Sequence, residues 1–171
     1  MSNKTYKARL FAERAHAAVG QVRKYTNAPY IVHPIEVAEI VKSVPHTDAM
    51  VAAAYLHDVL EDTKVTEQEL RAEFGDDITD LVVWLTDVST KTDGVRAVRK
   101  ALDRAHIAQA PAEAQTVKIA DLLSNTKTIV KFDPEFAKTY LREKLATLDV
   151  LTSGNAELRA RAYEECRKGL A

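Results

Sequence analysis

Apolar residues recur every three to four positions along most of the chain, which is the spacing that places them on one face of an α-helix. Alternating apolar and polar runs, which would predict strands, are rare, and helix-forming residues dominate. We therefore predict an all-α fold, a single-domain bundle of roughly eight to ten helices over residues 1–171. The expected helices cover about residues 5–18, 34–42, 48–60, 67–74, 77–85, 95–109, 111–132, 135–152 and 155–168.

Local signals set several of these boundaries. Pro34 suits the first turn of a helix and disfavours α conformation at His33, so His33 is expected at a helix entrance, aimed toward a cleft. Thr47 or Asp48 is the expected N-cap of the helix that follows, and Thr66-Glu67-Gln68-Glu69 has the spacing of a capping box. Gly154 is expected to cap the C-terminus of the helix over 135–152.

Composition indicates one globular core and argues against several kinds of partner and location. With 171 residues, 46% of them hydrophobic, the chain can bury one sizeable core. A net charge of −1 argues against bulk nucleic acid or an anionic membrane as the main partner. The single cysteine, Cys166, excludes an internal disulfide and is expected to be a packing or a surface residue. No apolar run has membrane-spanning length and the first residues do not resemble a signal peptide, so a cytoplasmic location is expected.

One stretch concentrates reactive side chains. An apolar run from Ala52 to Leu56 leads into His57-Asp58, and Glu61-Asp62 follow one turn later. On one continuous helix His57 and Glu61 stand at i,i+4, as do Asp58 and Asp62, so all four can share one end of one face. Taken alone, the stretch is equally consistent with a solvated acidic helix end.

Two further residues extend this stretch into a metal site. Asp121 interrupts an apolar run, where a lone buried carboxylate costs several kcal/mol unless it is paired or binds a metal. Together with His33, His57 and Asp58 it makes a mixed nitrogen and oxygen site that suits Mn²⁺, Fe²⁺ or Zn²⁺. Four protein ligands on a six-coordinate ion leave positions for water and a substrate oxygen, as hydrolysis requires.

Three segments carry a resemblance to a known family. Residues 30–38 (YIVHPIEVA), 56–63 (LHDVLEDT) and 117–125 (VKIADLLSN) together resemble HD-domain metal-dependent phosphohydrolases, and more closely the hydrolase domain of RelA/SpoT-type alarmone enzymes. The single-domain small alarmone hydrolases of that family are similar in length, and the resemblance spans about residues 5–165. It implies an HD-type helical bundle.

The resemblance also implies a reaction. The family hydrolyses the 3′-pyrophosphate of guanosine tetra- or pentaphosphate, usually with Mn²⁺. The implied metal ligands are His33, His57, Asp58 and Asp121. Glu61 and Asp62 match the pair that positions and deprotonates the attacking water.

Substrate contacts are implied on both sides of the metal motif. Arg23 and Lys24 match the basic pair that holds the nucleotide, Asn125 matches a contact to the ribose or its phosphate, and Thr128 falls where longer enzymes also place a Thr. His16, Gln21 and Tyr30 are interpreted as scaffold around the basic loop.

The segment 86–106 departs from the family pattern, although it keeps the basic pair Arg99-Lys100 as a candidate substrate contact. Its arginines, Arg96, Arg99 and Arg104, have helical spacing and form either a cationic face for polyphosphate or a solvated face balanced by Asp103. Lys127 stands where relatives commonly carry Arg. These departures leave the metal chemistry intact and the substrate open.

Two alternatives to an alarmone hydrolase remain. One is an HD phosphohydrolase for another nucleotide, such as a nucleoside monophosphate or a phosphorylated dinucleotide. The other is an inactive HD module that binds nucleotide or a protein. With no room for a synthetase domain, hydrolysis is the only activity expected, on a small-molecule nucleotide. The native metal and the oligomeric state stay open, a homodimer included.

Overall fold

The structure is a computed structural model that describes residues 3–171. Within these residues all regular elements are helices, and the extended backbone forms a single isolated bridge between Val22 and Pro29, which confirms the all-α prediction. The chain divides into two compact units, unit 1 (Met1–Thr86) and unit 2 (Asp87–Ala171), which are described separately below. The assignment of the whole chain to one domain stays a prediction.

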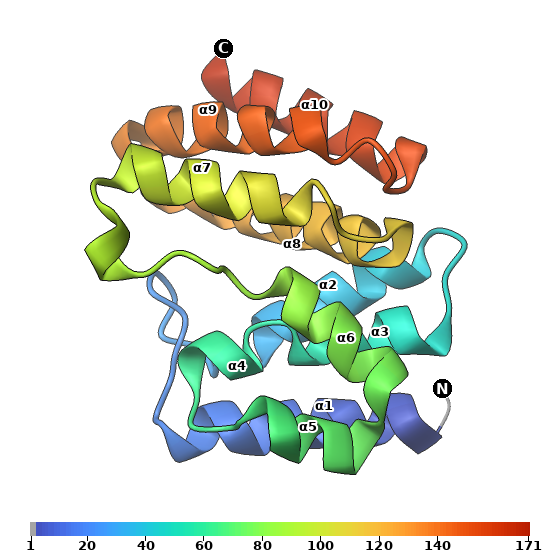
Figure 1. Cartoon of the computed structure of the whole chain (residues 1–171). Helices are drawn as coiled ribbons and strands as arrows, with labels where there is room; N and C mark the ends of the chain where they lie inside the picture. Colours follow the sequence, from blue (N-terminus) through green and yellow to red (C-terminus); the bar gives the residue numbers. More distant parts are fainter. Residues whose placement is uncertain (1–2) are drawn as a thin grey trace. The chain divides into compact units, whose positions relative to one another are not determined.

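Unit 1 is organised around one buried helix (Figure 1). Its third helix, α3, packs against α1, α2 and α6, while α4 lies on α1 and α5 on α6. The six helices are α1 (Asn3–Ala18), α2 (Val32–Lys42), α3 (Asp48–Leu56), α4 (Val59–Asp62), α5 (Glu67–Phe74) and α6 (Asp76–Leu85).

The sequence of α3 explains its central place. Every residue from Met50 to Leu56 is buried, and Ala52, Ala53 and Ala54 are small enough to let neighbouring helices approach closely. At its start, the Thr47 side chain accepts a hydrogen bond from the Met50 backbone N–H, which confirms the predicted N-cap. The helix therefore provides a rigid base for His57 and Asp58, the two residues directly after it.

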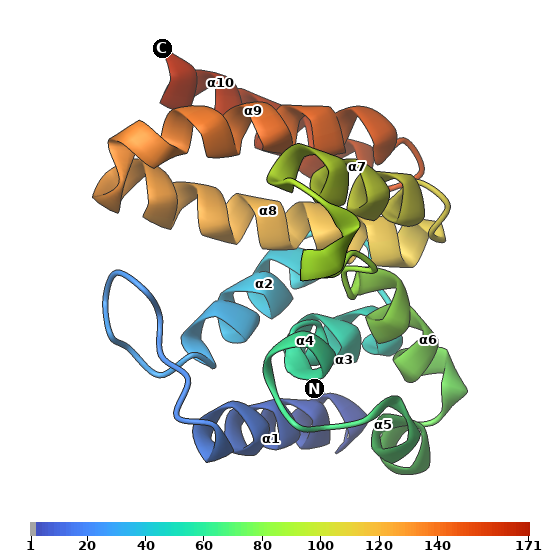
Figure 2. The ribbon, with the colours of Figure 1, turned by 60° about the vertical axis from the view of Figure 1, so that its left-hand side comes forward.

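Unit 2 is built on three long helices that pack on one another, α8 (Ala112–Phe132), α9 (Pro134–Val150) and α10 (Ala156–Leu170) (Figure 2). A further helix, α7 (Arg96–Ile107), lies along α9, and a short 3₁₀ turn, η1 (Lys91–Asp93), precedes it. Gln115 links α8 to the loop before it and to the loop between α9 and α10. Its side chain donates to the carbonyl of Ala110 and accepts from the backbone of Ser153 and Gly154. Cys166 is buried in this core, which makes it a packing residue rather than a surface one.

The helix predicted over 48–60 is wrong as one element. Helix α3 ends at Leu56 and a separate four-residue helix, α4, begins at Val59. Between them Asp58 has φ −98° and ψ −1°, the bridge region between helix and extended backbone. Neighbouring residues on a regular helix do not face each other, and this break lets the adjacent His57 and Asp58 side chains converge.

Two other local predictions are corrected. His33 lies inside α2 rather than before it, because Pro34 falls in the first helical turn, where a missing N–H removes no hydrogen bond. Gly154 is not a helix cap, since Leu151 takes that position at the end of α9. It is needed for space instead: a Cβ there would come within 2.7 Å of Ile119 Cδ1 and 3.2 Å of the Gln115 backbone.

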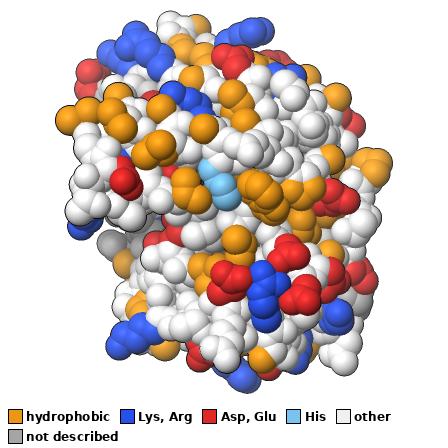
Figure 3. Space-filling model, viewed as in Figure 1, with side chains coloured by type: hydrophobic (Ala, Val, Ile, Leu, Met, Phe, Trp, Pro, Cys, Tyr) orange, Lys and Arg blue, Asp and Glu red, His pale blue; other side chains and the backbone are white. Residues whose placement is uncertain are grey.

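Over α5 and α6 the surface of unit 1 carries mostly acidic side chains, which surround the one basic side chain of these helices (Figure 3). The basic group is Arg71, which pairs with Glu67, Asp76 and Asp80 at 2.7–2.8 Å. The capping box predicted at Thr66 and Glu69 is present at the start of α5. None of the helices in residues 3–171 combines the length and the apolar character needed to cross a membrane.

Candidate metal centre

Three predicted ligands converge in unit 1. His33 comes from the first turn of α2, and His57 and Asp58 come from the break between α3 and α4. Their ligand atoms all lie within 4.8 Å of one another. His57 Nε2 is 2.9 Å and His33 Nε2 is 3.8 Å from Asp58 Oδ2, and both histidines are 2% exposed. Two imidazole nitrogens and a carboxylate oxygen form the donor set that suits Mn²⁺, Fe²⁺ or Zn²⁺.

The hydrogen bonding of His57 favours metal binding. Its Nδ1 is 2.8 Å from the Ala54 carbonyl oxygen, which can only accept, so Nδ1 carries the hydrogen. In the neutral imidazole Nε2 then holds the lone pair that a metal needs, and it faces Asp58. A cation between these two atoms would relieve the repulsion between that lone pair and the carboxylate.

Tyr30 orients Asp58, the third ligand of this group. Its hydroxyl donates a hydrogen bond to Asp58 Oδ2, and its ring packs edge-on to His33 and against His16, with centroids 5.9 and 4.6 Å apart. From the sequence, Tyr30 is expected only in the scaffold around the basic loop. The structure adds that this scaffold contacts a predicted ligand directly, which orients the carboxylate in the way outer-shell groups of metal sites do.

A second hydrogen-bonded chain ends on Asp62. Gln21 Nε2 donates to Asp62 Oδ2 at 2.8 Å, and Gln21 Oε1 lies 2.6 Å from His16 Nδ1. The Gln21 carbonyl oxygen accepts, so His16 Nδ1 carries the hydrogen. Burial lowers the pKa of His16 against the raising effects of Gln21, Asp58 and Asp62, which keeps the imidazole neutral at neutral pH. Asp62 is therefore oriented from α1 and the loop after it, and both Asp62 and Glu61 beside it on α4 are exposed.

The basic loop between α1 and α2 lies against the same group of side chains. The Arg23 guanidinium is 5.7 Å from the centroid of the Tyr30 ring, and the Lys24 ammonium is 4.8 Å from that of Tyr25. Figure 2 shows this loop extending from unit 1 as a narrow hairpin, closed by the bridge between Val22 and Pro29. Of the two predicted nucleotide contacts in this loop, Arg23 is thus next to Tyr30, the residue that orients Asp58.

Asp121 and Asn125 lie one turn apart on α8 in unit 2. Asp121 is buried at 6% exposure, accepts a hydrogen bond from Asn125 Nδ2 at 2.7 Å and pairs with Lys118 Nζ at 3.3 Å. The predicted shared face of Asp121 and Asn125 is confirmed. The roles of Asp121 as fourth ligand and of Asn125 and half-buried Thr128 as substrate contacts stay predictions.

The cationic residues of α7 have different surroundings from those expected. Arg96 forms a two-pronged ion pair with Glu143 at 2.7 and 2.8 Å, and Arg99 donates to the Gly94 carbonyl at 3.4 Å. Lys100 Nζ is 2.9 Å from Asp87 Oδ2 and 3.3 Å from Asp103 Oδ2. Asp103 also accepts from the Ser89 backbone and hydroxyl, so it anchors the preceding loop rather than balancing arginines.

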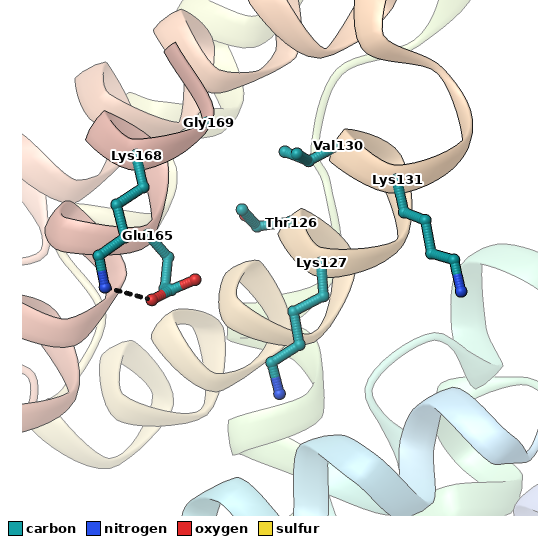
Figure 4. Close-up of a pocket in the computed structure, with 7 residues that line it drawn as sticks. All are labelled: Thr126, Lys127, Val130, Lys131, Glu165, Lys168 and Gly169. Carbon is teal, nitrogen blue, oxygen red and sulfur yellow. Dashed lines mark hydrogen bonds and ion pairs between the residues drawn. The ribbon is translucent and has the colours of Figure 1, made fainter. Parts of the chain in front are cut away.

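A separate pocket of about 230 Å³ lies between α8 and α10 in unit 2 (Figure 4). Thr126 and Val130 project into it, while the amino groups of Lys127 and Lys131 extend away from Gly169 and Lys168 pairs with Glu165. None of the predicted site residues lines it. We assign it no part in the candidate site.

Comparison with known proteins places this geometry in a family. A model described as the HD domain matches residues 8–168. The chain is 33% identical over 136 residues to a probable guanosine-3′,5′-bis(diphosphate) 3′-pyrophosphohydrolase of Synechocystis, a match that covers 78% of this chain and 18% of that protein. It is 36% identical over 110 residues to guanosine-3′,5′-bis(diphosphate) 3′-pyrophosphohydrolase MESH1 of Xenopus tropicalis, covering 63% of this chain and 59% of that protein.

A solved structure, described as a metazoan ortholog of SpoT that hydrolyses ppGpp, matches with a TM-score of 0.86 and 28% identity. That match covers 100% of this chain and 98% of the other. The chain spans about a fifth of the length of the first curated relatives, 18–19% of each. Since the family model covers nearly the whole chain and its histidine and aspartate donors converge, the chain belongs to the HD-domain family.

Proposed function

We propose that the chain is a metal-dependent pyrophosphohydrolase that removes the 3′-pyrophosphate from guanosine tetra- or pentaphosphate. The observation that carries the proposal is the convergence of His33, His57 and Asp58 in a chain whose similar proteins bear the name of that reaction. Water adds to the phosphorus attached to the 3′ oxygen, the bond from phosphorus to that oxygen breaks, and pyrophosphate and a 3′ hydroxyl result.

The proposed metal is Mn²⁺, held by His33, His57 and Asp58 with Asp121 as the fourth ligand. Asp121 is included because it follows the other three in the order of the family motif, and because its carboxylate is buried on α8. When bound, a divalent cation lowers the pKa of water toward neutrality and offsets negative charge on the attacked phosphate.

Glu61 and Asp62 manage the attacking water in this proposal. Asp62 is held by Gln21 and so has a fixed direction, which suits it to orient the water. Glu61 is exposed one residue earlier on α4, which suits it to accept the proton. Proton transfer by a positioned carboxylate typically contributes a factor of roughly 10²–10⁴ to the rate.

Cationic and polar side chains hold the nucleotide in this proposal. Arg23 stacks on the base or forks onto phosphate, and Lys24 supplies a point charge. Asn125 and Thr128 contact the ribose or its phosphate, and Arg99 and Lys100 contact the phosphate chain. Lys100 remains cationic in this role, because Asp87 and Asp103 together raise its pKa above the ordinary value although burial opposes its charge.

The test is pyrophosphate release from a panel of nucleotides with Mn²⁺ present. We expect release from guanosine tetraphosphate and none from guanosine 5′-diphosphate, which lacks the 3′ group. Turnover of a nucleoside monophosphate or a phosphorylated dinucleotide, without pyrophosphate release from guanosine tetraphosphate, would replace the proposal with another HD phosphohydrolase activity. Binding of nucleotide without any turnover would indicate an inactive module.

A further inference from the structure

Three lysines of unit 2 lie on three different helices, and the charges of two of them, Lys100 of α7 and Lys118 of α8, act on the third, Lys144 of α9. Two of them have carboxylate partners. Lys100 Nζ pairs with Asp87 and Asp103, and Lys118 Nζ lies 3.3 Å from Asp121 Oδ2. These pairs explain why those two ammonium groups are stable where they are.

Lys144 has no such partner. Within residues 3–171 its ammonium makes no hydrogen bond and no ion pair, and it lies over the face of the Tyr140 ring, 4.8 Å from the centroid. Burial, followed by the charges of Lys118 and Lys100, lowers the pKa of Lys144 to about 8, while Asp121 and Asp87 act in the opposite direction. By contrast Lys138, on the same helix, is exposed and pairs with Glu135 at 3.1 Å.

A half-buried ammonium without an ion pair, in the field of two others, costs free energy and gives no packing that an apolar side chain would not give better. Such an arrangement is expected where an anion binds. The carboxylates nearby, Asp87, Asp103, Asp121 and Glu143, do not remove this requirement, because each already pairs with Lys100, Lys118 or Arg96. In the proposed function Asp121 also binds a cation, which further reduces the negative charge available to Lys144.

We propose that Lys144, together with Lys118 and Lys100, forms a subsite for one phosphate group of the polyphosphate substrate or of the pyrophosphate product. The inference rests on the proposed function for the identity of the ligand. The ammonium groups arrive from three helices, so they can surround a tetrahedral oxyanion with donors on several sides. Lys144 would then determine affinity for the phosphate chain without touching the attacked bond.

The experiment measures binding of inorganic pyrophosphate to the full chain by calorimetry, at pH 7 and with chelator present to remove divalent ions. We expect Lys144→Met to weaken binding by about tenfold, the loss of one charge-assisted hydrogen bond. Lys138→Met, the matched control on α9, should bind as the wild type does, and Lys144→Arg should retain most of the affinity. Wild-type affinity in Lys144→Met, or no binding by the wild type, would overturn the inference.

Thermal melting without pyrophosphate separates a binding role from a packing role. We expect Lys144→Met to melt at or above the wild-type temperature, because the change removes an uncompensated charge. A clearly lower melting temperature together with lost affinity would assign Lys144 to packing and overturn the inference.

Steady-state kinetics distinguishes this inference from the proposed function. We expect Lys144→Met to raise KM for guanosine tetraphosphate about tenfold, while kcat changes by less than about threefold. Pyrophosphate binding that depends on Lys144 in a protein that hydrolyses no guanosine tetraphosphate would sink the proposed function alone. Hydrolysis with an unchanged KM in Lys144→Met would contradict the proposed phosphate subsite and leave the proposed function intact.

Discussion

Polar side chains in the interior of unit 1 and of unit 2 have different kinds of partners. In unit 1 the donors His57 and Asp58 are oriented by hydrogen bonds to backbone and to another side chain, namely the Ala54 carbonyl and the Tyr30 hydroxyl. In unit 2 the groups are full charges, and lysines are matched with aspartates. Lys144 is the exception. The first arrangement preorganises ligands for a cation, and the second supplies a positive charge that an anion can bind.

The difference has a physical basis. A cation site needs lone pairs held in a fixed direction, which hydrogen bonds to the far side of each ligand supply. An anion site needs positive charge that the protein has not already neutralised. Single substitutions test both arrangements, and the expected effects decrease in the order Asp58→Ala, Glu61→Gln, Gln21→Leu and deprotonation of Lys144.

Asp58→Ala should have the largest effect. It removes the carboxylate that faces both imidazoles, so we expect loss of bound metal and a fall in hydrolysis of at least roughly 10³-fold. Metal analysis of the purified variant and a pyrophosphate-release assay check this. Glu39→Gln, an exposed residue paired with Lys42, is the control and should behave as wild type. A variant at Asp58 that keeps stoichiometric metal would contradict the assignment of this ligand.

Glu61→Gln should lower the rate by about 10²–10⁴-fold without loss of metal, because it removes a proton acceptor that is not a ligand. The comparison of metal content with kcat for this variant separates the ligands from the residues that manage water. An unchanged kcat would reduce Glu61 to a solvated helix end.

Gln21→Leu should have an intermediate effect, roughly tenfold on kcat, because Asp62 loses the amide that orients it. Metal content should not change. Lys7, outside this chain of hydrogen bonds and paired with Glu73, offers Lys7→Gln as a matched surface control. Equal rates for Gln21→Leu and the wild type would show that Asp62 needs no orientation from the loop after α1.

The smallest effect is a pH dependence in unit 2. The titratable groups that face Lys144 are Lys118 and Asp121 of α8, Lys100 of α7, Asp87 before α7 and Cys166 of α10, together with Tyr140 and Glu143 of α9 itself. With a pKa of about 8, lowered mainly by burial, Lys144 is mostly protonated at pH 7 and mostly neutral at pH 9.

Pyrophosphate affinity should therefore fall severalfold between pH 7 and pH 9 in the wild type. In Lys144→Met the decline should be shallower, because Lys100, whose pKa is raised by Asp87 and Asp103 against the effect of burial, stays charged over this range. Parallel pH profiles for the two proteins would show that Lys144 does not contact the anion.

Much of the fold could be predicted from local pattern. The helix at α5 with its capping box, and the N-cap at Thr47, follow from side-chain hydrogen bonding to nearby backbone. The break at Asp58 could not be predicted in this way, because the sequence there has no glycine or proline. Packing of α4 on α1 and convergence on the histidines decide it, and neither is visible in local sequence.

The candidate site likewise contains some residues that the sequence predicts and others that only the structure reveals. His33, His57 and Asp58 could be found from the sequence because their order and context match a motif, and the structure brings their donor atoms together. The link from Gln21 to Asp62 spans 41 positions and depends on how α1 packs. Lys144 carries no motif at all, and only its lack of a partner among charged neighbours distinguishes it.

The most direct measurement of the central claim is guanosine tetraphosphate hydrolysis by protein stripped with a chelator and then titrated with Mn²⁺. We predict no pyrophosphate release from the stripped protein, and full recovery as one metal site fills in the wild type but not in Asp58→Ala. Equal rates before and after stripping, or recovery in Asp58→Ala, would contradict the claim that these donors hold a cation required for hydrolysis.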